Sequence, residues 1–221
     1  MIVAALADLH LGLPTTPGLP WALSALSSLS ALQDAERGGA DLLVFAGDLV
    51  DRGYATDEVV ADAETFLRAA VATGVPVLVT WGNHDVAADL PRRLPHIDGL
   101  TVAPADGPSE MRVGGLTVHT VSVADDPDPR RIVERFPIAG GGGSGADSAD
   151  GADGEVHLGV LHTSLTGEFS RKPCLPTTLA ELQSRRYDRW VLAHVHQPRM
   201  VSDSVGWVGM GRVEVLELGP G

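Results

Sequence analysis

Five apolar segments of this chain are each followed within three residues by polar side chains of the types that bind metal ions. The segments comprise residues 2–7, 42–46, 75–80, 156–161 and 190–193. The first three are nearly continuous in Val, Leu, Ile and Ala, which is typical of strands buried on both faces of an α/β sheet. Ligands bind such sheets outside the carboxyl ends of the strands. We therefore expect the polar residues that follow these segments to converge on one site.

The candidate ligands at the segment ends include five of the eight histidines. The whole set is Asp8, His10, Asp48, Asp51, Asn83, His84, Asp85, His162, His194 and His196. Asp8 and His10 are two residues apart, so they face the same side of an extended segment. The mixture of imidazole, carboxylate and amide groups suits Mn, Fe, Zn, Co or Ni better than Ca or Mg. Two such ions about 3.5 to 4 Å apart, sharing one carboxylate, can bind a phosphoester and activate a water molecule.

Helical patterns separate the first three segments, at residues 21–39 and 56–74. This alternation of strand and helix predicts an α/β fold. Residues 116–123 alternate apolar and polar side chains as a half-buried strand does, and residues 199–218 contain further short strands. We expect these later strands to form a second, more antiparallel sheet. The Gly-rich residues 139–155 are expected to form a flexible loop within a single domain spanning residues 1–221.

Composition and charge exclude several classes of protein. The chain is 44% hydrophobic and 20% charged, as in an ordinary globular protein. No apolar run reaches the roughly 18 to 20 residues that span a bilayer, and the amino terminus lacks a basic signal region. We therefore expect a cytoplasmic protein with no membrane partner. The net charge of −13 disfavours a protein that binds nucleic acid through its own surface, although bound metal cations would offset part of this negative charge.

The ordered motifs resemble those of the calcineurin-like metallophosphoesterases. They are "DLH" at residues 8–10, "GDLVDRG" at 47–53, "GNHD" at 82–85, the isolated His162 and "HVH" at 194–196. The resemblance implies an α/β sandwich of two sheets flanked by helices. The flanking sequences "LADLHLG", "LHTSLTG" and "HVHQP" further resemble the SbcD-type DNA repair exonuclease branch. One departure is Ala193, which stands where the family usually has glycine before the last motif.

The resemblance also implies a role for each residue. One metal ion would bind Asp8, His10, Asp48 and His196, and a second would bind Asp48, Asn83, His162 and His194. Asp48 would bridge two divalent ions, with Mn²⁺ the first choice. His84 would remain free of metal and either protonate the leaving oxygen or stabilise the transition state, with Asp85 orienting it. Asp51 would lie behind the ligands. Apart from the resemblance, Arg52 follows Asp51 and can contact a phosphate, but a solvated arginine fits the sequence equally well.

Three functions fit these motifs. The first is a DNA exonuclease or phosphodiesterase, for which the resemblance implies an SbcC-like ATPase partner, although no docking segment is visible in the sequence up to Gly221. The second is a phosphatase or phosphodiesterase for nucleotides or other small esters, which the negative charge favours. The third is a scaffold that binds metal without catalysis. His119, His157 and Cys174 do not follow segment ends in the same way, and we interpret them as structural.

Overall fold

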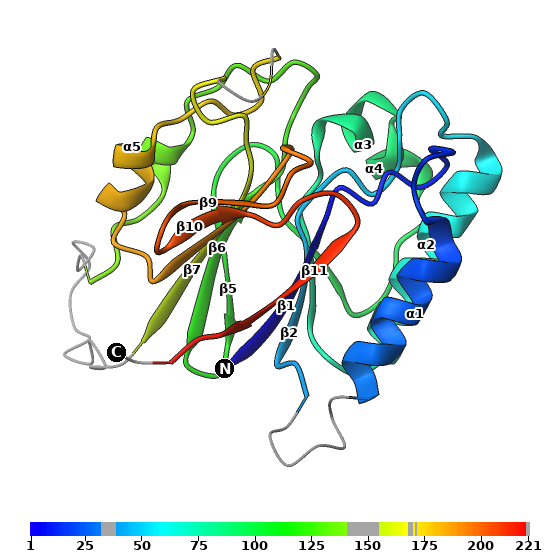
Figure 1. The fold of residues 1–221 in the computed structure, drawn as a ribbon, viewed down its shortest axis with the longest axis horizontal. Coiled ribbons are helices and arrows are strands. Elements are labelled where there is room, and N and C mark those ends of the chain that lie inside the picture. Colours follow the sequence, from blue (N-terminus) through cyan, green and yellow to red (C-terminus); the bar gives the residue numbers. More distant parts are fainter. Residues whose placement is uncertain (32–38, 141–154, 168–169, 171, 220–221) are drawn as a thin grey trace.

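The strands of the computed structural model form two sheets that pack face to face (Figure 1). The structure describes residues 1–31, 39–140, 155–167, 170 and 172–219. Most of the predicted flexible loop, and residues 32–38 of the first predicted helix, therefore lie outside the described residues.

The first sheet has the strand order β11-β1-β2-β3-β4. Its strands are β1 (Ile2–Ala7), β2 (Leu42–Phe45), β3 (Val77–Val79), β4 (Leu100–Val102) and β11 (Arg212–Glu217). The four strands β1 to β4 run parallel, and β11 pairs antiparallel with β1. The three predicted strands at the start of the chain are confirmed, and their carboxyl ends lie along one edge of this sheet.

The second sheet has the strand order β5-β6-β7-β8-β10-β9. Its strands are β5 (Ser109–Val113), β6 (Leu116–Val121), β7 (Val156–His162), β8 (Arg189–Ala193), β9 (Arg199–Ser202) and β10 (Val205–Trp207). The four central strands are parallel, and only the edge strands β5 and β9 are antiparallel. The fourth and fifth predicted segments are thus neighbouring strands, β7 and β8.

The prediction of a second, more antiparallel sheet is confirmed in part: two of its five strand pairings are antiparallel, against one of four in the first sheet, but one predicted strand is misplaced. The last strand, β11, joins the first sheet, where Leu216 packs into the core between the sheets. The centre of the second sheet is parallel. The alternation of apolar and polar residues shows which face of a strand is buried, but it does not identify the neighbouring strand.

Helices cover the outer face of each sheet (Figure 1). Helix α1 (Gly18–Ala31) and helix α2 (Asp57–Ala72) pack on the first sheet, and α3 (Asn83–Ala87) and α4 (Leu90–Arg93) follow β3. The 3₁₀ helix η2 (Val133–Arg135) and helix α5 (Leu179–Ser184) cover the second sheet. The predicted sandwich of two sheets flanked by helices is confirmed. In the described part of the chain, no helix is long and apolar enough to cross a membrane.

Helix α2 is stabilised by its own sequence and packs against a strand that leads into the site. The side chain of Thr56 accepts a hydrogen bond from the backbone N–H of Val59 and so caps the helix. Asp57 and Glu58 lie in the first turn, where negative charge is favoured by the helix dipole. Phe66 is fully buried and packs against Phe45 of β2. The helix therefore holds the strand whose end carries Asp48.

Gly159 in β7 provides a test of packing under α5. A Cβ atom at this position would lie 2.2 Å from the ring of Trp190, which is buried and donates to the carbonyl oxygen of Leu182. We expect Gly159→Ala to lower the free energy of unfolding by about 1–3 kcal/mol, because the ring must shift in a close-packed core. Chemical denaturation measures this change. Gly115→Ala is the matched control, since a Cβ there would meet nothing within 4 Å. Equal losses in both variants would contradict this packing argument.

Candidate metal centre

The ends of five strands from both sheets bring the predicted ligands together. Asp8 and His10 follow β1, Asp48 follows β2, and Asn83 follows β3. His162 ends β7, and His194 and His196 follow β8. All of these side chains are buried except those of His194, which is partly buried, and His196, which is exposed. The convergence predicted from the sequence is therefore observed, although it takes strand ends from two sheets.

Four of these residues have left-handed backbone conformations, which side chains other than glycine rarely adopt. Their φ angles are 51° at Asp8, 43° at His10, 54° at Asp48 and 92° at His194. Such conformations cost of order 1–3 kcal/mol each and persist where the surrounding structure imposes them. Here backbone hydrogen bonds tie two strand ends together, from Asp8 N–H to the Gly47 carbonyl oxygen and from His10 N–H to that of Asp48. The strained turns aim the side chains at a common point.

Two glycines allow the loops to approach the ligands closely. A Cβ atom on Gly47, whose φ angle is 96°, would lie 2.5 Å from Nδ1 of His162. A Cβ on Gly82 would lie 2.2 Å from Oδ1 of Asp48. Any side chain at either position would therefore displace a ligand. This explains why each of the motifs "GDLVDRG" and "GNHD" begins with glycine.

Asp8, His10 and His196 form the first ligand group. Each offers one atom that lies within 4.8 Å of the others. The Nε2 atoms of His10 and His196 are 3.0 Å apart. Oδ2 of Asp51 lies 3.3 Å from Nδ1 of His10, although this buried nitrogen makes no hydrogen bond within the described residues.

Asn83, His162 and His194 form the second ligand group. Oδ1 of Asn83 lies 3.2 Å from Nε2 of His162 and 2.9 Å from Nδ1 of His194. The other nitrogen of each imidazole has its own partner, since Nδ1 of His162 lies 3.0 Å from the Ala46 carbonyl oxygen and Nε2 of His194 lies 2.8 Å from Oγ of Ser170. These outer contacts leave the inner nitrogens available to a metal ion.

Asp48 lies between the two groups. Its Oδ2 is 3.2 Å from Nε2 of His162 and 3.7 Å from Nε2 of His10. Its Oδ1 accepts the backbone N–H of His84 at 2.8 Å. A carboxylate in this position can bridge two ions, so the donor set fits two divalent metals, one in each group. The assignment of each ligand to one ion remains a prediction from the resemblance.

The electrostatics of the centre favour the replacement of protons by cations. Burial opposes charge on both Asp48 and His162, but their mutual attraction prevails, lowering the pKa of Asp48 and raising that of His162 to about 9. Burial also raises the pKa of Asp8 to about 7, and lowers that of His10 to about 4 and that of His194 to about 3. At neutral pH without metal, His162 therefore holds a proton where a cation would bind.

Asp51, and not Asp85, contacts the imidazole of His84. Oδ2 of Asp51 lies 3.1 Å from Nδ1 of His84. The carboxylate of Asp85 instead accepts the backbone N–H groups of Val50 and Gly82, each at 3.0 Å. The predicted role of Asp85 in orienting His84 is therefore wrong. Asp85 is fully buried and joins the loops after β2 and β3, so its effect on His84 is indirect.

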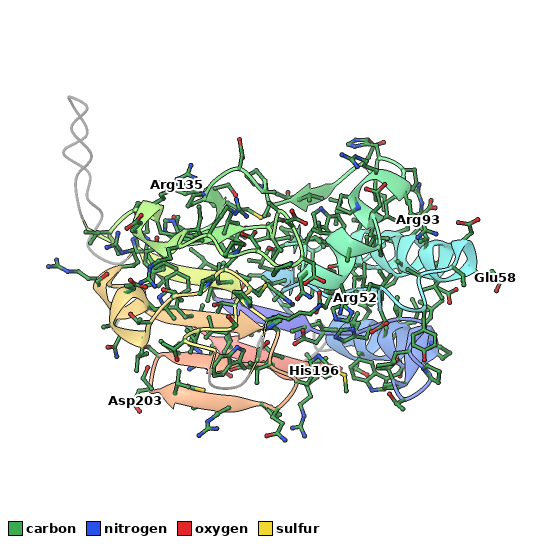
Figure 2. All side chains as sticks on the ribbon, turned by 90° about the horizontal axis from the view of Figure 1, so that it is seen from above. Arg52, Glu58, Arg93, Arg135, His196 and Asp203 are labelled. Carbon is green, nitrogen blue, oxygen red and sulfur yellow. The ribbon has the colours of Figure 1, made fainter. Side chains whose placement is uncertain are left out.

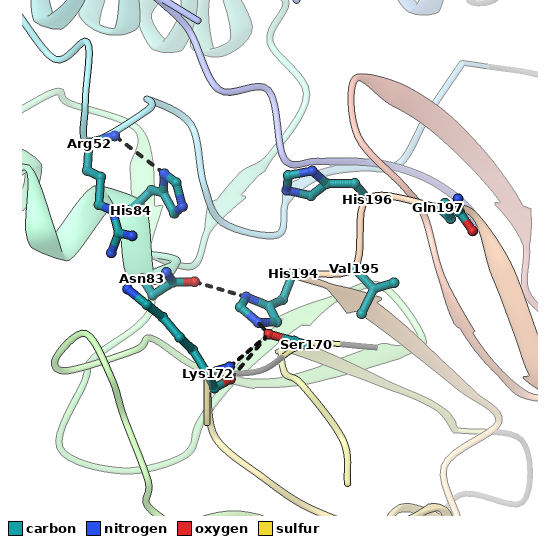
Figure 3. A pocket seen from close by; sticks show the side chains of 9 residues that line it. All are labelled: Arg52, Asn83, His84, Ser170, Lys172, His194, Val195, His196 and Gln197. Carbon is teal, nitrogen blue, oxygen red and sulfur yellow. Dashed lines mark hydrogen bonds between the residues drawn. The ribbon is translucent and has the colours of Figure 1, made fainter. Parts of the chain in front are cut away.

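The centre opens into a pocket of about 540 Å³ (Figure 3). Its lining comprises Arg52, Asn83, His84, Ser170, Lys172, His194, Val195, His196 and Gln197. Asn83 and His84 are consecutive in the first turn of α3, and a helix rotates successive side chains by about 100°, so one can face the metals while the other faces the pocket. Arg52 lines this pocket, and its contact with a phosphate stays a prediction. Its guanidinium pairs with Asp126.

Sequence reasoning missed Asp126, Ser170, Lys172 and Gln197. Asp126 follows the strand predicted at residues 116–123, so the rule applied to the other five segments would have found it. No comparable signal marks Ser170, Lys172 or Gln197.

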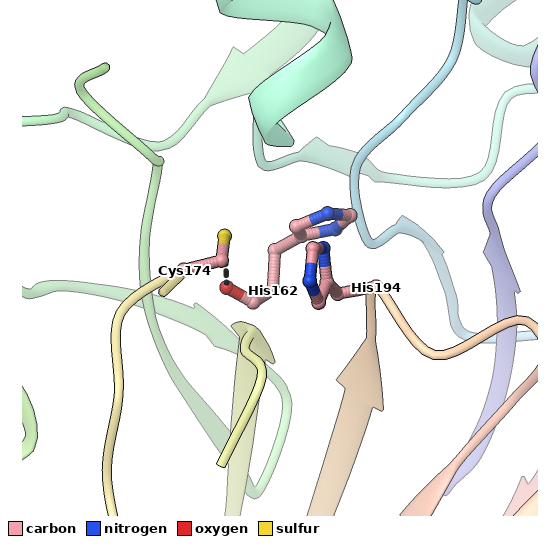
Figure 4. A group of neighbouring side chains, drawn as sticks. All are labelled: His162, Cys174 and His194. Carbon is pink, nitrogen blue, oxygen red and sulfur yellow. Dashed lines mark hydrogen bonds between the residues drawn. The ribbon is translucent and has the colours of Figure 1, made fainter. Parts of the chain in front are cut away.

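Cys174 lies beside the second ligand group (Figure 4). Its Sγ and the nitrogens of His162 and His194 lie within 4.8 Å of one another. Burial raises the pKa of the thiol well above its usual range, and the thiol donates to the His162 carbonyl oxygen. A protonated thiol is a poor metal ligand, which agrees with a structural role.

His119 and His157 lie within strands β6 and β7, away from the ligand groups. Nε2 of His119 is 3.0 Å from Nδ1 of His157, and both rings stack with Tyr187. These contacts agree with a role in packing.

The fold and the two ligand groups agree with those of a metal-dependent phosphoesterase. The family model of the calcineurin-like phosphoesterases matches residues 1–199, and the chain belongs to this family. No curated protein sequence matches the chain.

Three solved structures are similar to the chain. A dimetal phosphatase from Danio rerio is 13% identical, with 94% of this chain and 86% of that chain covered and a TM-score of 0.53. The protein TT1561 of Thermus thermophilus is 14% identical, with 95% and 89% covered and a TM-score of 0.48. Nuclease MPE of Pseudomonas putida is 18% identical, with a TM-score of 0.37, and the match covers 71% of this chain and 59% of the nuclease. At 13% identity, the similarity to the phosphatase supports only the assignment of the fold.

The protonated state of His162 predicts that metal binding depends on pH. A cation that binds Nε2 must displace a proton held with a pKa of about 9. We expect Mn²⁺ affinity to rise from pH 6 to pH 8, by up to about tenfold per unit for one displaced proton. Calorimetry of the metal-free protein in buffers of different ionisation enthalpy counts the released protons. At pH 8, where Asp8 with its pKa of about 7 is mostly ionised, His162→Asn should lose most of this release, and unchanged release in that variant would show that the proton comes from elsewhere.

Proposed function

We propose that this protein hydrolyses phosphodiesters at a dinuclear centre, with Mn²⁺ as the metal and a DNA strand as the first substrate to test. The observation that carries the proposal is the pair of ligand groups with Asp48 between them, beside a pocket lined by Arg52 and Lys172. Bound divalent ions would polarise the phosphoryl group and supply an activated water. The resemblance of the flanking sequences to the SbcD-type branch supports DNA as the substrate.

The residues around the pocket can assist this reaction. His84 is partly exposed to the pocket, and its Nδ1 accepts the backbone N–H of Arg52 at 3.4 Å, so a neutral ring carries its proton on Nε2, which can present it to the leaving oxygen. The side chain of Arg52 is 35% exposed and that of Lys172 is 52% exposed. Both can donate hydrogen bonds to non-bridging phosphate oxygens.

A second candidate is a phosphatase or phosphodiesterase that acts on nucleotides or other small esters. The net charge of −13 disfavours a long contact with a nucleic acid backbone. The pocket volume of about 540 Å³ lies in the range that suits a small ligand. These two observations concern substrate size and leave the chemistry of the centre unchanged.

A substrate panel separates the two candidates. The Mn²⁺-loaded protein would be assayed with bis-p-nitrophenyl phosphate, p-nitrophenyl phosphate, cyclic nucleotides, and labelled single- and double-stranded DNA. Cleavage of DNA and of the diester supports the first candidate, whereas hydrolysis of small esters alone supports the second. Failure to hydrolyse any phosphoester would contradict both and favour a metal-binding scaffold. His162→Ala, prepared identically, controls for a contaminating nuclease.

His84→Ala tests the separation of metal binding from chemistry. A general acid typically contributes about 10²- to 10⁴-fold, so we expect kcat to fall by roughly two decades or more while both metals are retained. The fall should be smaller for p-nitrophenyl esters, whose leaving group needs little protonation. Steady-state kinetics and elemental analysis measure the two effects. His96→Ala is the control, because His96 is exposed and pairs with Asp98.

The opposite result is also informative. A nitrogen of His84 lies within 4.8 Å of ligand atoms of His10 and Asp48. If His84→Ala loses metal as readily as His162→Ala, then His84 is a ligand and the proposed acid role is wrong.

A further inference from the structure

Asp126 joins three residues of the pocket, although it does not line the pocket itself. Its Oδ1 accepts a hydrogen bond from Nδ2 of Asn83 at 3.3 Å. Its Oδ2 pairs with the guanidinium of Arg52 and lies 3.5 Å from Nζ of Lys172. The side chain of Asp126 is only 7% exposed, so the carboxylate lies beneath these groups.

The contact with Asn83 decides which way its amide points. An ionised carboxylate only accepts hydrogen bonds, so the NH₂ group of Asn83 must face Asp126. The carbonyl oxygen then faces Nε2 of His162 and Nδ1 of His194, where the second metal ion would bind. The reversed amide would place its carbonyl oxygen against the carboxylate and direct hydrogens at the cation. Asp126 thus selects the orientation in which Asn83 can be a ligand.

Arg52 from the loop after β2 and Lys172 from the segment after β7 hold the carboxylate of Asp126 in place. The side chains of Arg52 and Lys172 each retain N–H donors that Asp126 does not use, because an arginine side chain has five N–H donors and a lysine side chain has three. They can therefore anchor Asp126 and still face the pocket.

We propose that Asp126 is a positioning residue that holds the amide of Asn83 with its oxygen toward the second metal ion, anchored by Arg52 and Lys172. The inference rests on the metal centre of the proposed function, but it concerns metal affinity and does not depend on the substrate. Residues that orient metal ligands typically change metal affinity about 10- to 100-fold when replaced.

Calorimetric titration of the metal-free full chain with Mn²⁺ tests the proposal without a turnover assay. We expect Asp126→Ala to weaken one of the two ions about 10- to 100-fold. Asp126→Asn keeps an oxygen that can accept from Asn83, so its affinity should stay within about threefold of the wild type. This rescue by the conservative variant distinguishes orientation of the amide from a general loss of charge or packing.

Asp203→Ala and Asp203→Asn are the matched controls. Asp203 is exposed and lies in the turn between β9 and β10, far from Arg52 and His196 (Figure 2). Thermal unfolding followed by circular dichroism would establish that each variant is folded. Wild-type affinity for both ions in Asp126→Ala, or equal losses in Asp126→Ala and Asp126→Asn, would overturn the proposal.

Asn83→Ala separates this inference from the proposed metal centre. If Asn83→Ala binds both Mn²⁺ ions as the wild type does, the ligand role of Asn83 is wrong and the inference fails with it. If Asn83→Ala weakens one ion and Asp126→Ala does not, the centre stands and only the positioning role of Asp126 is wrong. Parallel losses in both variants support the two together.

Discussion

The buried contact between Asp48 and His162 is the interaction on which the site depends. It joins a strand end of the first sheet to a strand end of the second, and both side chains are almost fully buried. A buried carboxylate or imidazolium without a partner is strongly unfavourable, so each requires the other when no cation is present. The two sheets must therefore pack with β2 and β7 in one relative position. Gly47 and Gly82 make that approach possible because their backbones leave room beside the His162 ring and the Asp48 carboxylate.

The same requirement explains the strain at the strand ends. Asp8, His10, Asp48 and His194 adopt left-handed conformations, and an extended continuation of each strand would carry these side chains away from the centre. Backbone hydrogen bonds between the loops offset part of the cost, as does the carboxylate of Asp8, which accepts the N–H of His194. The result is a donor set that is already assembled, so binding of a cation needs little rearrangement. Such preorganisation concentrates strain at functional sites.

Four aspartates near the pocket show that one residue type can serve four purposes. Asp48 lies between the ligand groups, and Asp51 lies close to the rings of His10 and His84. Asp85 joins two loops by accepting backbone N–H groups. Asp126 contacts Asn83 and the positively charged side chains of Arg52 and Lys172. Each purpose follows from what the carboxylate oxygens touch. Asp85 is adjacent to His84 in sequence, yet the helical turn directs their side chains apart, whereas Asp51 approaches from another loop.

Local sequence was sufficient to predict most of the strands, the helices between the first three of them, and the residues that meet at the candidate centre, whereas β4 and β5 were not predicted. Buried parallel strands are continuous apolar runs, and polar residues directly after them must lie at the carboxyl edge of a sheet. Tertiary structure decided which strand ends meet, since β11 pairs with β1 and the ligands come from two sheets. It also decided the outer contacts, such as Asp51 to His84 and Asp126 to Asn83. Local patterns specify burial and backbone preference, but contacts between segments distant in the chain depend on how the sheets pack, and no local pattern records that packing.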